Sequence, residues 1–231
     1  MLVIAHRGAS VAAAENTVDA FRLADEFGAD GVETDVRLSP RGCLVVSHDV
    51  VADLDAMLPF AEGLDACGDR MLVNVEIKNS VSDGGFDPTC EIVPLVVDEL
   101  DRRGAGHGHR WLVSSFSWAT LEAVRRVAPE LPTAWLCKVV DDARRREVLD
   151  RVAAAGHRAL HPWEGAVTDS LVADCHALGL AVNVWTSNDP TRLRTLDELG
   201  ADGVCTDVPD VGLRAVGRSP AAMPRWTFHP A

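Results

Sequence analysis

Charged residues alternate along two strand-like segments of the sequence. Glu33 and Asp35 stand two residues apart in one segment, and Glu76 and Lys78 have the same spacing in another. Residues at i and i+2 of a strand face the same side of a sheet, and buried carboxylates need a compensating charge. Sites built from oxygen ligands suit Mg²⁺ or Ca²⁺, so we predict that Glu33, Asp35 and Glu76 bind a divalent cation. The alternative is an internal salt-bridge network with Lys78 and Arg7.

Two histidines and an arginine lie beside this acidic set. His6 and Arg7 end a strand-like run at the N-terminus, and His48 follows another extended run. A pair of histidines can divide acid and base work near neutral pH, and the planar guanidinium of Arg7 matches phosphate oxygens. A hard metal ion, a cationic group and two proton carriers together indicate phosphoryl chemistry.

These residues need a scaffold that brings separate strands to one place. Strand-like runs alternate with amphipathic helical stretches, which indicates a parallel sheet. The eight expected strands are residues 2–6, 31–38, 72–78, 111–115, 133–136, 159–161, 181–185 and 203–206. The expected helices are residues 17–27, 90–103, 118–128, 144–155, 168–178 and 190–199. Eight units in 231 residues predict an α/β fold, a closed (β/α)8 TIM barrel whose strand ends converge at one mouth.

One segment interrupts the alternation, between the second and third strands. Residues 43–70 begin with an apolar run at 44–46, which indicates an extra strand, and continue as an acidic and poorly periodic stretch. We therefore expect a short insertion after the second strand. The rest of the chain contains no linker-like composition. We expect residues 1–231 to form a single barrel domain.

Composition restricts the partners and the compartment. The formal net charge is −13, which disfavours nucleic acid and anionic lipid as partners. The longest apolar runs are too short to span a membrane, and the N-terminus lacks the features of a signal peptide. The six cysteines are scattered and form no C-x-x-C pair, which favours a reducing environment. We expect a cytoplasmic protein without stable membrane insertion; its oligomeric state is left open.

An ordered set of motifs resembles the glycerophosphodiester phosphodiesterase family. The motifs are His-Arg-Gly at 6–8, Glu-Asn-Thr at 15–17, Gly-Ala-Asp-Gly-Val-Glu-Thr-Asp-Val at 28–36, Ser-His-Asp at 47–49, Glu-Ile-Lys at 76–78, Asn-Val-Trp-Thr at 183–186 and Gly-Ala-Asp-Gly at 200–203. The resemblance extends over roughly residues 4 to 210. It implies a barrel hydrolase that needs a divalent metal cation and releases glycerol 3-phosphate and an alcohol from glycerophosphodiesters.

The resemblance also implies roles for individual residues. His6 and His48 would be the general acid–base pair, and Arg7 would hold the phosphate. The metal ligands would be Glu33, Asp35 and Glu76, which are the carboxylates already singled out by their spacing. We expect the 2-hydroxyl of the glycerol to attack phosphorus, with a cyclic phosphate that water then opens.

Four further positions follow from the resemblance. Lys78 would lie beside the phosphate and a metal-binding carboxylate. Trp185 would line the pocket and contact the carbon skeleton of the substrate. The alternative for Trp185 is simple packing within the barrel. Glu15 and Asn16 would brace the loop after His6, and a helix cap is the alternative for this pair.

The chain departs from the family pattern after Ser-His-Asp. Most relatives carry a longer insertion there, whereas only residues 50–71 separate this motif from the third strand. A shorter cover over the mouth leaves lysophospholipase D activity on larger phosphodiesters as an alternative.

Other readings of the barrel are weaker. Lys78 as a Schiff-base lysine conflicts with Glu76, which would keep it charged. A non-catalytic binding protein would be expected to lack a key acid or histidine. His161 stands at a strand end near the mouth, where substrate contact is the less favoured reading. We expect Asp207 to cap a turn with Thr206.

Overall fold

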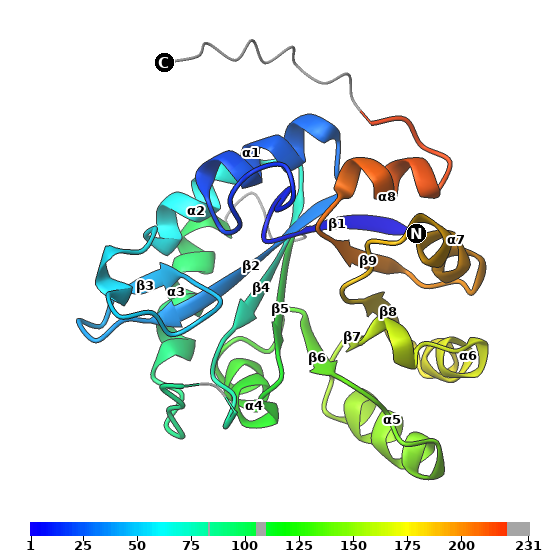
Figure 1. Cartoon of the computed structure of the whole chain (residues 1–231). Coiled ribbons are helices and arrows are strands. Elements are labelled where there is room, and N and C mark those ends of the chain that lie inside the picture. Colours follow the sequence, from blue (N-terminus) through cyan, green and yellow to red (C-terminus); the bar gives the residue numbers. More distant parts are fainter. Residues whose placement is uncertain (83, 105–109, 221–231) are drawn as a thin grey trace, which may run out of the picture.

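Eight parallel strands form a closed barrel in the computed structural model, which describes residues 1–82, 84–104 and 110–220 (Figure 1). The strands are β1 (Leu2–His6), β2 (Gly31–Leu38), β4 (Leu72–Ile77), β5 (Trp111–Ser115), β6 (Thr133–Cys137), β7 (Ala159–Pro162), β8 (Ala181–Val184) and β9 (Gly203–Thr206). Each strand pairs with its neighbour in the chain order, and β1 closes the barrel by pairing with both β2 and β9. The predicted (β/α)8 barrel is confirmed.

Helices surround the barrel on the outside (Figure 1). They are α1 (Val18–Phe27), α2 (Phe60–Ala66), α3 (Ile92–Gly104), α4 (Trp118–Val127), α5 (Arg145–Ala154), α6 (Asp169–Ala177), α7 (Pro190–Glu198) and α8 (Pro209–Ala215), with short 3-10 turns η1 (Leu54–Ala56), η2 (Asp142–Arg144) and η3 (Glu164–Ala166). Side chains of Thr17, Ser117, Thr168 and Asp189 accept hydrogen bonds from the first free amides of α1, α4, α6 and α7. These caps explain why these four helices begin where they do.

The insertion after the second strand contains more regular structure than its sequence indicates. β3 (Leu44–Val46) pairs antiparallel with the end of β2, as expected for an extra strand. The helices α2 and α8 are not among the predicted helices. Both span only seven residues, so neither displays enough turns for an apolar period to stand out.

Alternation along the strands separates the hydrophobic core from a polar barrel interior. The fully buried Val32, Val73 and Val75 belong to the apolar layer that the helices cover. Between them lie polar residues, and the parallel register of β2 and β4 sets Asp35 opposite Glu76. The strand period therefore directs the acidic residues into the barrel interior.

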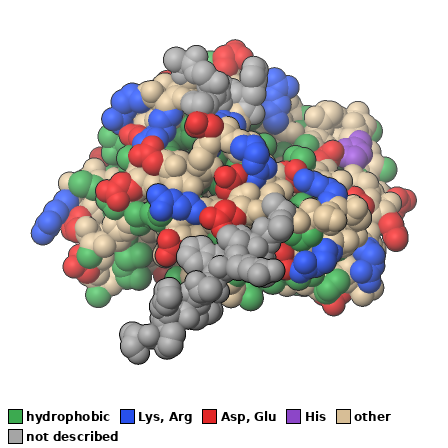
Figure 2. Space-filling model, turned by 90° about the horizontal axis from the view of Figure 1, so that it is seen from above, with side chains coloured by type: hydrophobic (Ala, Val, Ile, Leu, Met, Phe, Trp, Pro, Cys, Tyr) green, Lys and Arg blue, Asp and Glu red, His purple; other side chains and the backbone are tan. Residues whose placement is uncertain are grey.

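The outer surface carries mixed charges. On the face seen from above in Figure 2, acidic and basic side chains are interspersed. Among the described residues, no helix combines the length and the apolar composition needed to cross a bilayer.

Candidate active site

A cavity of about 100 Å³ lies where the predicted site residues converge. Seven of those nine residues line it: His6, Arg7, Glu33, His48, Glu76, Lys78 and Trp185. The other two, Glu15 and Asp35, contact Arg7 from its sides. A larger cavity of about 300 Å³ also includes Lys78 in its wall. The strand ends thus bring together residues that are up to 179 positions apart in the sequence.

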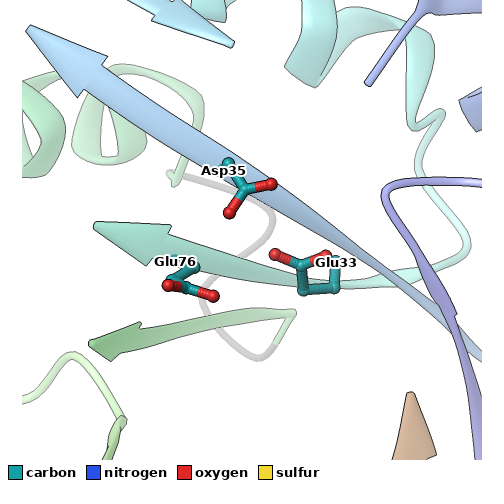
Figure 3. Close-up of side chains that lie close together, drawn as sticks. All are labelled: Glu33, Asp35 and Glu76. Carbon is teal, nitrogen blue, oxygen red and sulfur yellow. The ribbon is translucent and has the colours of Figure 1, made fainter. Parts of the chain in front are cut away.

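Three carboxylates form an acidic cluster at the side of the cavity. Glu33 and Asp35 extend from β2 and Glu76 from β4, and each offers an oxygen within 4.8 Å of the others (Figure 3). Oε1 of Glu33 and Oδ1 of Asp35 are buried without a hydrogen-bond partner in the described part of the chain. Burial, together with the charge of Asp35, raises the pKa of Glu33 well above its usual range and that of Glu76 to about 7.

Two cationic side chains, Lys78 and Arg7, partly neutralise this cluster. Lys78 Nζ lies 2.8 Å from Glu76 Oε1 and 3.7 Å from Asp35 Oδ1, and Arg7 Nε lies 3.3 Å from Asp35 Oδ2. The internal salt-bridge network considered from the sequence is therefore present. It leaves Oε1 of Glu33 without a partner among the described residues, and it gives Oδ1 of Asp35 an ion pair but no hydrogen bond. A divalent cation fits these incompletely paired oxygens.

The loop after β1 is held in a strained conformation by contacts to the cluster. Arg7 and Asn16 both have a φ of 56°, in the left-handed region that residues other than glycine rarely adopt. Asn16 Nδ2 donates to Asp35 Oδ2 over 2.9 Å, and Arg7 Nη1 donates to both carboxylate oxygens of Glu15 over 2.9 and 3.0 Å. Glu15 and Asn16 thus contact Arg7 and the acidic cluster, and Thr17 rather than these two residues caps α1.

His6 is oriented by a carboxylate from the opposite end of the chain. Its Nδ1 lies 2.6 Å from Asp207 Oδ1, and its Nε2 lies 3.9 Å from Glu33 Oε2. Burial alone would raise the pKa of Asp207, but hydrogen bonds from His6, Asn188 and Ser10 outweigh it and lower the pKa to about 2. An ionised Asp207 fixes the proton of His6 on Nδ1 and leaves Nε2 toward the cavity.

This contact corrects the expectation that Asp207 caps a turn. Thr206 Oγ1 does accept from the amide of Val208, but the carboxylate of Asp207 is directed to His6. The available signal was positional, since Asp207 follows the last strand of a barrel in which that strand must pair with the first.

His48 is held through both its side chain and its backbone. Nδ1 lies 2.7 Å from Asp49 Oδ1, and the pKa of His48 is lowered chiefly by burial. The buried Arg37 donates from Nε and Nη2 to the carbonyl oxygen of His48, over 3.0 and 2.6 Å. Sequence reasoning missed Arg37, because only the β2–β3 hairpin reveals that it reaches this carbonyl.

Two aromatic rings form part of the cavity wall. Trp185 and Phe116 both line the cavity and meet edge to face with ring centroids 5.3 Å apart. Trp185 Nε1 donates to the carbonyl oxygen of His161 over 2.8 Å. Trp185 therefore lies in the cavity wall, and both packing against Phe116 and a hydrogen bond fix the indole.

Comparison with known proteins gives a family match along most of the chain. A family model described as the glycerophosphoryl diester phosphodiesterase family matches residues 6–65 and 66–211. A protein of Caldanaerobacter subterraneus subsp. tengcongensis named glycerophosphodiester phosphodiesterase is 30% identical over 247 residues. That alignment includes 93% of this chain and 97% of the relative.

Solved structures have the same architecture. A structure from Silicibacter pomeroyi, provisionally described as a glycerophosphoryl diester phosphodiesterase, superposes with a TM-score of 0.84 at 28% identity, over 95% of both chains. A phosphodiesterase from Oleispira antarctica, solved with its product sn-glycerol-3-phosphate, gives a TM-score of 0.80 at 24% identity, over 94% of this chain and 97% of that one. At 24% identity, the similarity to the Oleispira antarctica structure supports the assignment of the fold alone.

Proposed function

We propose that this chain, which belongs to the glycerophosphoryl diester phosphodiesterase family of phosphoric diester hydrolases, uses a divalent cation to hydrolyse glycerophosphodiesters to glycerol 3-phosphate and an alcohol. One observation carries the proposal. Glu33 and Glu76 line the same cavity as two oriented histidines and the cationic side chains of Arg7 and Lys78, and the buried Asp35 completes their carboxylate cluster. Buried oxygens of Glu33 and Asp35 have no hydrogen bond within the described part of the chain. This combination suits a negatively charged substrate that must exchange protons at two oxygens.

The acidic cluster would hold the cation. Glu33, Asp35 and Glu76 supply hard oxygen ligands, and Mg²⁺ or Ca²⁺ fits such a set. When bound, the cation would neutralise phosphate charge and lower the cost of the buried carboxylates. Arg7 and Lys78 would bind the non-bridging phosphate oxygens, since both line the cavity beside the cluster.

The two histidines would transfer the protons. One imidazole accepts a proton from the 2-hydroxyl of the glycerol as that oxygen attacks phosphorus, and the other donates a proton to the departing alcohol. Water then opens the five-membered cyclic phosphate with the roles of His6 and His48 exchanged. Asp207 and Asp49 orient the rings by accepting from Nδ1, which leaves each Nε2 for the substrate.

The remaining predicted residues would position the substrate. Trp185 would offer an apolar face to the glycerol carbons, in the cavity that Glu33 and Glu76 also line. Glu15 fixes the guanidinium of Arg7 because both of its carboxylate oxygens accept hydrogen bonds from Arg7 Nη1. The larger cavity beyond Lys78 provides room for the alcohol. We further propose that residues 1–231 act as one domain and that the protein works in the cytoplasm, which its six unpaired cysteines support.

The test is coupled detection of glycerol 3-phosphate from glycerophosphocholine and glycerophosphoethanolamine, with Mg²⁺ or Ca²⁺ present. Release from either substrate by the wild-type protein, and its loss in a His6→Ala variant that still folds, would support the proposal. Lysophosphatidylcholine is assayed in parallel. A preference for that substrate would replace the proposed activity by lysophospholipase D. Failure on every substrate would refute the assignment.

A further inference from the structure

We propose that His161 binds the free terminal hydroxyl of the glycerol moiety and thereby selects substrates whose glycerol carries no acyl group. This inference rests on the proposed function, because it names the part of the glycerophosphodiester that His161 contacts. His161 lies on β7, across the cavity from the acidic cluster, and no metal or catalytic role requires it.

The geometry around His161 determines where its proton sits. The carboxamide nitrogen of Asn183 on β8 lies 3.0 Å from Nε2 of His161. A carboxamide nitrogen can only donate, so Nε2 accepts and the proton of a neutral imidazole lies on Nδ1. The carboxamide of Asn183 fits beside β9 because residue 203 is glycine and has no side chain. A Cβ there would approach Asn183 Oδ1 to 2.6 Å.

The imidazole stays neutral because it is buried away from water. His161 is 2% exposed, and burial lowers its pKa to about 3. Leu136 and Trp185 line the same cavity. His161 therefore does not serve as an acid or base near neutral pH. It provides a fixed hydrogen-bond donor, and Nδ1 has no hydrogen-bond partner among the described residues.

A second polar group in the cavity wall also lacks a partner. Asn74 on β4 is 2% exposed, and its carboxamide oxygen is buried without a hydrogen bond from any described residue. Buried polar groups are rarely left unpaired, so an unpaired donor and an unpaired acceptor in one cavity indicate a ligand that carries hydroxyl groups. The free terminal hydroxymethyl group of a glycerol phosphate is such a ligand.

Substitution of that hydroxyl should therefore be penalised. An acyl group on the terminal oxygen removes its proton and adds bulk inside a cavity of about 100 Å³. Removal of the hydroxyl leaves Nδ1 of His161 buried and unpaired when the substrate is bound, which costs a factor of about 5 to 150 in affinity. Both changes keep the 2-hydroxyl that attacks phosphorus.

Two substrate analogues test this assignment. The wild-type protein is assayed on glycerophosphocholine, on 2-hydroxypropyl phosphocholine, which lacks the terminal hydroxyl, and on the water-soluble 1-acetyl glycerophosphocholine. We expect kcat/KM to be at least about tenfold higher for glycerophosphocholine than for either analogue. Comparable values for all three would overturn the inference while leaving the diesterase activity established. No hydrolysis of glycerophosphocholine would refute the proposed function, and the inference with it.

Variants locate the preference at His161. In His161→Leu, which removes the donor, the ratio between glycerophosphocholine and 2-hydroxypropyl phosphocholine should fall toward one. His161→Gln keeps an N–H donor and should retain part of the ratio. His157→Gln is the matched control, because His157 is also buried but bonds Thr133 outside this cavity. An unchanged ratio in His161→Leu would contradict the assignment.

Calorimetry supplies a readout that does not depend on turnover. Glycerol 3-phosphate should bind the metal-loaded protein about tenfold more tightly than 2-hydroxypropyl phosphate, and His161→Leu should abolish this difference. If His161→Leu does not fold, His161→Gln is compared instead: a reduced difference would support the assignment, and a difference equal to that of the wild type would contradict it. Equal affinities of the wild-type protein for the two phosphates would overturn the proposal.

Discussion

Replacement of Glu76 by glutamine should stabilise the metal-free protein while removing its response to metal. The carboxylate is buried, and its pKa is raised from an ordinary value of 4.5 to about 7. A raised pKa means that the folded state binds the proton more tightly than the unfolded chain. The contribution to stability is therefore complete below pH 4.5 and is lost as the pH rises through about 7.

The magnitude follows from the size of the pKa difference. At 1.36 kcal/mol per unit, the ionised Glu76 costs the metal-free fold about 3 kcal/mol at pH 7.5. The glutamine side chain mimics the protonated acid and avoids this cost. We expect the free energy of unfolding of Glu76→Gln to exceed that of the wild type by up to this amount, or about 6–12 °C in Tm. Near pH 4.5 the difference should vanish.

The assay is denaturant unfolding at pH 7.5 and 4.5, in EDTA and in excess Ca²⁺ or Mg²⁺. Wild-type protein should gain stability from the cation at pH 7.5, whereas Glu76→Gln should gain little and should lose activity. Glu130→Gln at an exposed position is the control and should behave as the wild type. The reasoning is refuted if metal-free Glu76→Gln is no more stable than the wild type at pH 7.5, or if the cation stabilises both equally.

Three further outcomes follow from the site. Asp207→Asn should lower kcat by about 10²–10⁴-fold in a protein that still folds but has a lower Tm. An amide can select the wrong tautomer of His6, and it loses the stabilisation that the ionised carboxylate gains from its hydrogen bonds; steady-state kinetics with near wild-type kcat would exclude this role. His48→Ala should lower kcat by at least about 10²-fold while circular dichroism stays unchanged, and a fully active variant would exclude acid–base work. Lowering the pH from 7 to 4.5 should reduce the free energy of unfolding of the wild type by about 2–3 kcal/mol more than that of His161→Gln. The folded protein keeps His161 neutral down to a pKa of about 3, whereas the unfolded chain binds the proton below about 6.5. Urea unfolding at both pH values measures this difference, and equal losses would contradict it.

The acidic cluster could be predicted because its signal is local. Glu33 and Asp35 share a face through the two-residue period of a strand, and the parallel register of β2 and β4 then sets Asp35 beside Glu76. The barrel itself followed from eight repeated strand–helix units, each short enough to recognise by periodicity. In both cases a pattern within a short stretch of sequence is enough to predict which side chains share a face or which elements form.

The parts that escaped prediction depend on long-range contacts. Asp207 meets His6 only because β9 closes against β1, and the two residues are 201 positions apart. Arg37 reaches the carbonyl of His48 only across the β2–β3 hairpin. The orientation of His161 depends on Asn183 and on the room left beside it by Gly203. Side-chain types at these positions gave no local sign of their partners.

The central claim is that a divalent cation at Glu33, Asp35 and Glu76 is needed for diester hydrolysis. The most direct measurement is release of glycerol 3-phosphate from glycerophosphocholine by metal-stripped protein, as Ca²⁺ or Mg²⁺ is titrated back. We expect no release in EDTA and a saturable return of activity with one cation per chain, absent in Glu76→Gln. Full activity of the stripped protein, or equal recovery in Glu76→Gln, would contradict the claim.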